Sequence, residues 1–243
     1  MSEKVIVLTG AAGGLGQIFA KNLAQLGYQL ALIDFADLQP LMHTLSSDGV
    51  KVRVYQCDLN NPDQISQIGQ QILQEFGRCD VLINNAAYIP LQKFAESEFS
   101  EWKKTIAVSL DASYLLSKIF APSMIGNGWG RIVNFSSSNT GRPQKGFMAY
   151  IAAKTGVIGL TRALAVELGD AGVTVNTISP GLIKHEGSAA NLPAEMFEHV
   201  RNSQFIPRTG EPKDLVGVLN FIISPESGYM TGQVFHVDGG FLM

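Results

Sequence analysis

The sequence of 243 residues has little cysteine, little histidine and no cluster of basic residues. Its two cysteines, Cys57 and Cys79, cannot build a disulfide framework, and their scarcity weakly indicates an intracellular protein. The four histidines are scattered and no C-x-x-C motif is present, which argues against a metal site. A net charge of −3 without a basic block argues against nucleic acid and anionic membranes as partners.

No run of apolar residues approaches the length of about 20 that spans a bilayer. The first residues, MSEKVIVLTG, pass directly into an apolar run, without the basic region and cleavage site of a signal peptide. Hydrophobic residues make up 46% of the chain and charged residues only 16%, which allows a substantial core. We therefore expect a soluble, cytoplasmic protein.

Short β-branched runs alternate with segments of helical periodicity along the whole chain. The predicted strands are Lys4–Leu8, Gln29–Asp34, Lys51–Gln56, Asp80–Asn84, Arg131–Ser136, Val173–Ser179 and Gln233–Val237. Seven strands separated by helices predict a parallel sheet with helices on both faces, joined by right-handed crossovers. No linker or repeat divides the chain, so we predict a single α/β domain over residues 1–243.

One predicted connection is much longer than the others. The segment from Leu182 to Pro207 lacks strand alternation and contains glycine, serine, asparagine and proline. Such a long excursion within a compact domain is usually either functional or disordered. Met196, Phe197 and Val200 have the spacing of a short amphipathic helix, which favours a folded lid over residues 184–207.

A glycine-rich turn lies between the first predicted strand and the first predicted helix, in "VIVLTGAAGGLGQIFAKNLAQLG". Gly10, Gly14 and Gly16 would let the backbone turn tightly and approach a pyrophosphate, with Leu15 between the last two. The helix that follows would present free N–H groups and a partial positive charge to the same phosphates. An ordinary strand-to-helix turn is the alternative, but the strand, turn and helix in succession favour nucleotide binding.

Asp34 ends the second predicted strand, close to the distance of about 20 residues expected for the acid that binds a ribose 2′-hydroxyl. Its carboxylate would repel the 2′-phosphate of NADP, and no Arg or Lys in the turn or directly after Asp34 would neutralise that phosphate. A helix N-cap or a solvated side chain is the alternative role. We predict NAD as the cofactor, with Asp58 and Leu59 of the "CDL" segment near its adenine.

The motifs TGAAGGLG, CDL, NNAA, a serine run, YIAAK, SPGLI and YMTGQVFHVDGG occur in this order along the chain. In order and spacing they resemble the short-chain dehydrogenase/reductase family over essentially the whole sequence. The resemblance implies a Rossmann-type doubly wound sheet, a nicotinamide cofactor and a homotetramer. It also implies cofactor contacts from the NNAA and SPGLI segments, through Asn85, Ala86, Pro180, Gly181 and Ile183.

Tyr150 and Lys154 are the candidate acid–base pair. Hydride transfer between an alcohol and nicotinamide needs a group that takes or gives the hydroxyl proton, worth about 10² to 10⁴ in rate. A tyrosine with a pKa of about 10 is a poor base unless positive charge stabilises its phenolate. Lys154 lies four residues after Tyr150, on the same helical face, and could supply that charge. A surface pair is the alternative, which the accompanying cofactor motifs disfavour.

Three serines precede Tyr150 in "NFSSSNTGRPQKGFMAYIAAK". The family spacing selects Ser137, thirteen residues before Tyr150, as the hydroxyl that positions the substrate oxygen. By the same comparison, Ser136 would close the strand and Ser138 would line the pocket.

The sequence departs from the family pattern at two positions. The family's fourth catalytic residue is an asparagine seven positions after a tryptophan; counting from Trp102 gives Ser109. In the family, the backbone carbonyl of that asparagine anchors a water linked to the lysine. A serine keeps the carbonyl, so we expect an altered proton relay but no loss of activity. His185 stands where many members have a threonine that contacts the cofactor, and either a solvent-facing role or a contact with substrate or pyrophosphate is open.

Within the family, several stretches resemble bacterial NAD-dependent dehydrogenases of ring-bearing alcohols, which suggests a small cyclic or aromatic alcohol as substrate. The candidate pocket residues, besides the lid, are Tyr88, Ile89, Ser138, Asn139, Gln144, Phe147 and His185. One alternative is a 3-oxoacyl-[acyl-carrier-protein] reductase, which Arg142 and Lys145 would suit and Asp34 opposes. The other is a nucleotide-binding regulator without catalysis, which only Ser109 favours.

Overall fold

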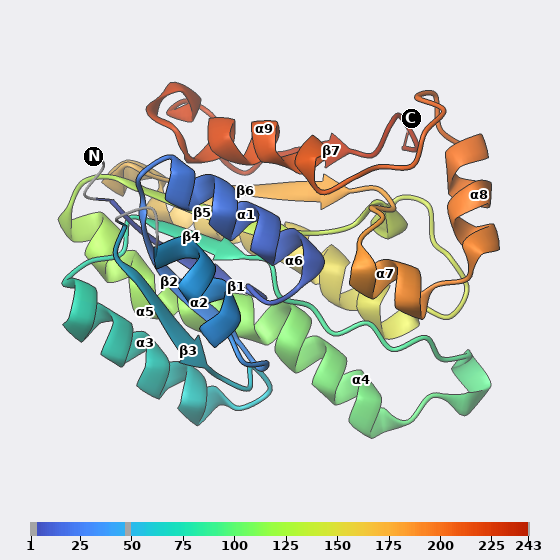
Figure 1. Cartoon of the computed structure of the whole chain (residues 1–243), viewed down its shortest axis with the longest axis horizontal. Coiled ribbons are helices and arrows are strands. Elements are labelled where there is room, and N and C mark those ends of the chain that lie inside the picture. Colours follow the sequence, from blue (N-terminus) through green and yellow to red (C-terminus); the bar gives the residue numbers. More distant parts are fainter. Residues whose placement is uncertain (1–3, 47–49, 243) are drawn as a thin grey trace.

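The computed structural model describes residues 4–46 and 50–242, and in this part of the chain a seven-stranded parallel sheet forms the centre (Figure 1). The strand order is β3-β2-β1-β4-β5-β6-β7, which is the doubly wound order of a Rossmann-type sheet. The strands are β1 Val5–Thr9, β2 Gln29–Asp34, β3 Val52–Gln56, β4 Val81–Asn84, β5 Gly130–Phe135, β6 Val173–Pro180 and β7 Val234–Val237. Each overlaps a predicted strand, so the predicted fold class is confirmed.

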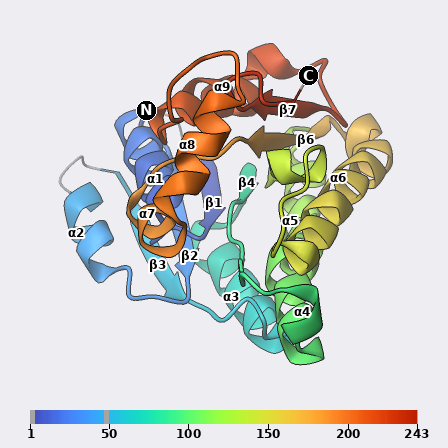
Figure 2. The same cartoon turned by 90° about the vertical axis from the view of Figure 1, so that its right-hand side faces the viewer.

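Helices cover both faces of the sheet, and each face has its own apolar core (Figure 2). One face packs on α1 (Gly14–Gln25), α2 (Gln39–Ser46) and α9 (Lys213–Ile223). The other packs on α3 (Pro62–Phe76), α5 (Ala112–Gly126) and α6 (Met148–Leu168). Burial on both faces explains why the central strands are continuous apolar runs.

Local sequence sets the ends of these helices where the caps are clear. Helix α3 starts after Asn61, whose side chain accepts the N–H groups of Asp63 and Gln64, and Pro62 occupies its first turn. It ends at Gly77, which has a φ of 72° in the left-handed region that glycine adopts without strain. This pairing of an asparagine cap with a terminal glycine is readable in the sequence.

The long connection after β6 folds into two short helices, α7 (Glu186–Asn191) and α8 (Ala194–Asn202). In Figure 1 both lie at the right, on the side to which the arrowheads of β6 and β7 point. The helix predicted around Met196, Phe197 and Val200 is therefore present, as α8, and Val200 is its buried residue. The segment 184–207 stands at the carboxyl edge of the sheet, where open α/β sheets bind ligands.

One stretch in the described part of the chain, Met148–Ala171, has the length and mean hydropathy, 1.2, of a membrane span. Core helices share these properties, and this stretch contains α6, which packs on β6 and buries Lys154. A third of its most apolar window is buried, so part of an apolar face of α6 remains uncovered.

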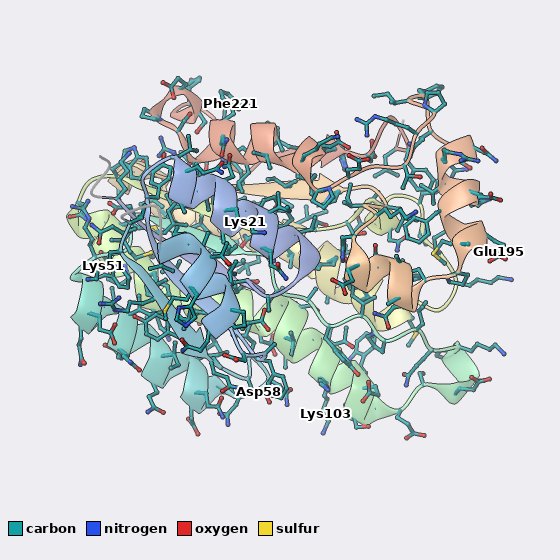
Figure 3. All side chains as sticks on the ribbon, in the orientation of Figure 1. Lys21, Lys51, Asp58, Lys103, Glu195 and Phe221 are labelled. Atoms are coloured by element: carbon teal, nitrogen blue, oxygen red, sulfur yellow. The ribbon has the colours of Figure 1, made fainter. Side chains whose placement is uncertain are left out.

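Charged side chains are distributed over several elements. The labelled lysines in Figure 3 come from α1 (Lys21), the approach to β3 (Lys51) and α4 (Lys103), which spans Phe99–Ile106, while Glu195 projects from α8. This dispersal matches the absence of a basic block in the sequence.

Candidate active site

The predicted site residues converge at the carboxyl edge of the sheet. Most of them end or follow strands β1 to β6, or lie in the first two turns of α1 and α6, and Ser109 lies between α4 and α5. Parallel strands bring their carboxyl ends to one edge, so residues far apart in the sequence meet there.

The glycine turn has the close backbone packing that a phosphate cradle needs. Gly10 has a φ of 67°, and a Cβ on Gly16 would overlap the carbonyl oxygen of Gly10. The side chain of Asn85 closes the turn from β4, because its Nδ2 donates to the carbonyl oxygens of Thr9 and Gly10 at 3.0 and 3.1 Å. The turn therefore tolerates no side chain at Gly16, and the backbone of α1 begins directly behind it.

Asp34 bridges this turn and the end of β2. Its Oδ2 accepts the N–H of Ala12 at 2.9 Å and its Oδ1 accepts the N–H of Ala36 at 3.0 Å. The side chain is half-buried and forms no ion pair with a basic group among the described residues. The side chain of Asp34 thus lies beside the glycine turn.

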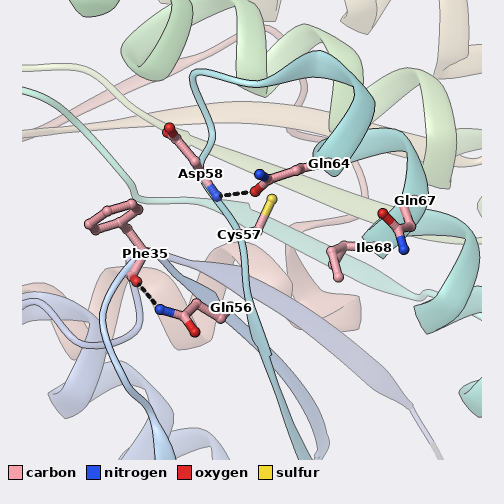
Figure 4. A pocket seen from close by; sticks show the side chains of 7 residues that line it. All are labelled: Phe35, Gln56, Cys57, Asp58, Gln64, Gln67 and Ile68. Carbon is pink, nitrogen blue, oxygen red and sulfur yellow. Dashed lines mark hydrogen bonds between the residues drawn. The ribbon is translucent and has the colours of Figure 1, made fainter.

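A cavity of about 530 Å³ opens at the ends of β2 and β3 (Figure 4). Phe35, Gln56, Cys57, Asp58, Gln64, Gln67 and Ile68 line it. Gln64 accepts the backbone N–H of Asp58 at 2.9 Å, which fixes the start of the loop after β3. The cavity lies next to Asp34, at the side of the site where the sequence predicts the adenosine end of a dinucleotide.

Sequence reasoning missed Phe35 and Gln64. Phe35 is 70% exposed although it directly follows the buried strand that ends in Asp34. An exposed aromatic residue at the end of a buried strand is the signal that could have identified it.

Ser137, Tyr150 and Lys154 lie together at the end of β5. Ser137 lies close enough to the Tyr150 hydroxyl to lower its pKa. Lys154 is 2% exposed, its Nζ lies 5.8 Å from the centre of the Tyr150 ring, and it donates to the carbonyl oxygen of Phe135 at 2.7 Å. The structure therefore brings the predicted trio together, on the first turns of α6 and the loop that precedes it.

Burial dominates the proton affinities of this pair. Burial raises the pKa of Tyr150 to about 12, although the nearby Ser137 lowers it in part. It lowers the pKa of Lys154 from 10.5 to about 7. In the protein alone, Lys154 is thus not a permanent cation, and its charge does not offset the burial of Tyr150. The activation of Tyr150 by Lys154 together with an oxidised nicotinamide ring stays a prediction.

The three consecutive serines have different environments. Ser136 follows β5 directly, and its hydroxyl donates to the carbonyl oxygen of Lys154 at 2.9 Å, which ties α6 to the sheet. Ser137 accepts the N–H of Asn139 at 3.2 Å, so its hydroxyl hydrogen is free to point at Tyr150 or a substrate. Ser138 is buried at the start of a short helical turn.

Ser109 lies fully buried in a π-helical turn, Ala107–Asp111, which joins α4 to α5. Its Oγ accepts the N–H of Tyr88 at 3.0 Å and lies 3.4 Å from the carbonyl oxygen of the same residue. The hydroxyl of Tyr88 in turn donates to Glu101 at 2.7 Å. The side chain of Ser109 is therefore committed to holding the loop after β4, and the hydroxyl of Tyr88 is committed to α4.

His185 packs on the glycine turn. Its Cγ and Nδ1 would lie 2.5 Å from a Cβ on Gly14, and its Nδ1 accepts the N–H of Ser188 as the cap of α7. It also borders a second cavity of about 530 Å³ beside α1 and the start of α9. This position connects the segment 184–207 to the glycine turn.

The remaining predicted residues surround the same edge. Ile183 is buried and pairs with Gly210, and Gly181 donates its N–H to Val237 at 3.0 Å, directly after Pro180 at the end of β6. Phe147 is buried with its ring centre 6.1 Å from that of Tyr150, while Gln144 is half-buried in the preceding loop. Leu59 is buried beside Asp58, and Ala86 donates its N–H to Thr9 at 3.1 Å.

Comparison with known proteins gives one consistent picture. The family model described as enoyl-(acyl carrier protein) reductase matches residues 10–242. The chain is 34% identical to (2S)-[(R)-hydroxy(phenyl)methyl]succinyl-CoA dehydrogenase subunit BbsD of Thauera aromatica, covering 99% of this chain and 97% of that protein. It is 32% identical to a 3-oxoacyl-[acyl-carrier-protein] reductase of Synechocystis, covering 100% and 98%.

A solved structure from Beutenbergia cavernae has the same fold, with a TM-score of 0.94 and 31% identity over 100% of this chain and 98% of that one. It is described as an NAD(P)-dependent gluconate 5-dehydrogenase and contains bound NADP.

Proposed function

The chain belongs to the short-chain dehydrogenase/reductase family, and we propose that it is an NAD-dependent enzyme for a small cyclic or aromatic alcohol and its ketone or aldehyde. The family makes it an oxidoreductase of CH–OH and carbonyl groups. The observation that carries the proposal is the convergence of Ser137, Tyr150 and the buried Lys154 at the edge of the sheet where the glycine turn lies.

The residues present fit a nicotinamide dinucleotide. The backbone of the glycine turn lies at the start of α1, where the phosphates would bind. Asp34 stands at the position for a ribose hydroxyl, and the cavity at β2 and β3 can hold the base. When bound, the cofactor supplies the hydride acceptor and, in its oxidised form, a positive charge.

The chain's own residues would handle the proton. Ser137 would donate to the substrate oxygen and fix its position, and Tyr150 would take the hydroxyl proton as the alcohol is oxidised. In its charged form, Lys154 would stabilise the resulting phenolate. In the protein without cofactor, burial sets the pKa values of both Tyr150 and Lys154. We therefore expect the rate of alcohol oxidation to rise with pH until Tyr150 can ionise.

Asp34 supports NAD over NADP. The 2′-phosphate of NADP would meet a carboxylate that already accepts two backbone N–H groups and has no arginine or lysine in the turn to offset it. The NADP in the Beutenbergia cavernae structure belongs to that protein, so the preference of this chain rests on its own Asp34.

Two resemblances support a ring-bearing alcohol. Stretches around α5 and α6 resemble (S)-1-phenylethanol dehydrogenase and pyridoxal 4-dehydrogenase, and the name of the Thauera aromatica relative describes an alcohol carbon that carries a phenyl group. Phe147, buried against Tyr150, offers an aromatic surface beside the reacting position.

The second candidate is a 3-oxoacyl-[acyl-carrier-protein] reductase, which the relative in Synechocystis favours. Arg142 and Lys145 are exposed near the site and could meet an acidic carrier. However, the guanidinium of Arg142 already lies 4.5 Å from the ring centre of Phe241, so it serves a packing role at the chain's end. A regulator without catalysis is disfavoured because it would not need Ser137, Tyr150 and Lys154 together.

We also propose that the protein is a cytoplasmic homotetramer and that residues 184–207 close over the substrate. Exposed apolar side chains on α4, α5, α6 and α9 support assembly; they include Phe99, Tyr114, Val166 and Phe221, the last labelled in Figure 3. The contact of His185 with Gly14 supports a lid that meets the cofactor.

A panel assay tests this function. The protein is incubated with NAD⁺ and aromatic, alicyclic, polyol and sugar-acid alcohols, and NADH formation is followed at 340 nm. We expect turnover of ring-bearing secondary or primary alcohols. Turnover confined to 3-oxoacyl thioesters with NADPH would favour the reductase instead.

A further inference from the structure

The sheet face under α6 changes from apolar to polar within two residues. Leu82, Ile132 and Val175 pair in register across β4, β5 and β6 and belong to the apolar core. Two residues further along the same strands, on the same face, stand Asn84, Asn134 and Thr177. All three are buried, at 3%, 0% and 0% exposure, so this polar row lies inside the protein.

The row forms a chain of hydrogen bonds that continues onto α6. Nδ2 of Asn84 donates to Oδ1 of Asn134 at 2.8 Å, and Nδ2 of Asn134 donates to Oγ1 of Thr161 at 2.8 Å. Oγ1 of Thr161 lies 2.7 Å from Oγ1 of Thr177. At the other end, Oδ1 of Asn84 is buried and has no hydrogen-bond partner among the described residues. Buried polar atoms rarely remain unpaired, and an ordered water is the usual partner where the protein supplies none.

Lys154 lies over the same gap between β4 and β5. The N–H of Ser136 points to β6, since it donates to Ile178, so the carbonyl of the preceding Phe135 points to β4. The hydrogen-bonded pairing of β4 with β5 ends at Asn84 and Asn134. The carbonyl oxygen of Phe135 therefore has no strand partner on this side and accepts from the Nζ of Lys154. An ammonium has three donors, so further acceptors are needed on this side.

We propose that Oδ1 of Asn84 and the ammonium of Lys154 share one buried water, which makes Asn84 a positioning residue for Lys154. The proposal deepens the proposed function, because it assigns the support of the lysine on which Tyr150 depends. The neutral oxygen of Asn84 stabilises the charged lysine without a carboxylate, whose full charge would hold the proton too firmly for an acid–base role.

The surroundings of Lys154 suit such support. Burial is the cause that lowers the pKa of this lysine to about 7, and no charged side chain in the described part of the chain offsets it. The titratable group that faces it is Tyr150, from its own helix; Ser109 of the neighbouring π-helical turn is neutral, and β5 presents a carbonyl.

The direct test is the titration of Lys154 in protein that contains neither cofactor nor substrate. Its side-chain nitrogen is followed by ¹⁵N NMR with labelled lysine and assigned by the signal lost in Lys154→Arg. Asn84→Ala should lower the pKa of Lys154 by about one pH unit, the size of one hydrogen bond to a charged group. Asn84→Asp places a carboxylate at the same position and should raise it.

Thr161→Val is the matched control, because it breaks the same chain of hydrogen bonds and leaves Oδ1 of Asn84 in place. It should lower the melting temperature but leave the pKa of Lys154 where it is. An unchanged pKa in both Asn84 variants, or an equal shift in Thr161→Val, would overturn the proposal. If Asn84→Ala does not fold, the sign of the shift in Asn84→Asp decides. Since no turnover is measured, a wild-type protein that fails to form NADH would count against the proposed function alone.

Discussion

We predict that the chain rejects NADPH and that replacement of Asp34 by asparagine lets it accept both dinucleotides. The carboxylate of Asp34 is half-buried beside the glycine turn and accepts the N–H groups of Ala12 and Ala36. An asparagine keeps an oxygen for the N–H of Ala12, so the turn should stay in place while the charge is removed.

The magnitude follows from Coulomb's law. Two unit charges 4 Å apart interact by about 1 kcal/mol in water and about 4 kcal/mol near a protein surface, and a phosphate monoester carries a charge of nearly −2. A repulsion of at least about 2 kcal/mol therefore opposes NADPH, which corresponds to roughly 30-fold in Kd. The charge-assisted hydrogen bond from a ribose hydroxyl adds about 1.5 to 3 kcal/mol in favour of NADH.

The assay is the Kd of NADH and of NADPH, measured by the fluorescence of the bound nicotinamide at low and high salt. We expect the wild type to prefer NADH by at least about 30-fold, and Asp34→Asn to tighten NADPH by about that factor while weakening NADH. Asp37→Asn is the matched control, since Asp37 is an exposed carboxylate three residues away that caps the N–H of Gln39. Equal binding of both dinucleotides by the wild type, or the same change in both variants, would refute the reasoning.

Two further substitutions test the supports of the site. Ser109→Ala should lower the free energy of unfolding by about 1 to 3 kcal/mol, because it leaves the part-buried N–H of Tyr88 without its acceptor. Ser117→Ala removes a hydroxyl that bonds a helix carbonyl and should cost about 1 kcal/mol or less in the same denaturant titration. Equal losses in the two variants would argue against this role of Ser109. Lys154→Met should raise the melting temperature at pH 7. The folded pKa of Lys154 is about 7 and its ordinary value is 10.5, so the unfolded chain binds more protons between these values and wild-type stability rises with pH. The gain from methionine should therefore shrink toward pH 10, and a gain that does not depend on pH would contradict this explanation.

The strands could be predicted from the sequence because each buried strand is a short apolar run between helical segments, and the doubly wound arrangement was implied by the family resemblance. The strand predicted as Lys4–Leu8 is Val5–Thr9 in the structure, a shift of one residue, since Lys4 lies just outside the buried run. Gly10, Asp34, Tyr150 and Lys154 were found because their spacing is set by strand and helix lengths.

Properties that arise only from packing could not be predicted. The sequence shows that a serine stands at position 109, but not that a π-helical turn aims its hydroxyl at the backbone of Tyr88. It pairs Tyr150 with Lys154, but does not show that burial brings the pKa of the lysine to about 7. The polar row that includes Asn84 and Asn134 depends on strand register, which no local pattern specifies.

The most direct test of the account is the rate of NADH formation by the wild type and by Tyr150→Phe with the best alcohol of the panel. Phenylalanine keeps the ring that packs beside Phe147 and removes only the hydroxyl that is proposed to take the proton. The account predicts that kcat falls by about 10² to 10⁴ while the Kd of NADH stays within about two-fold. Unchanged turnover in Tyr150→Phe would contradict it, because the proton would then have to leave the alcohol by a route that does not involve this residue.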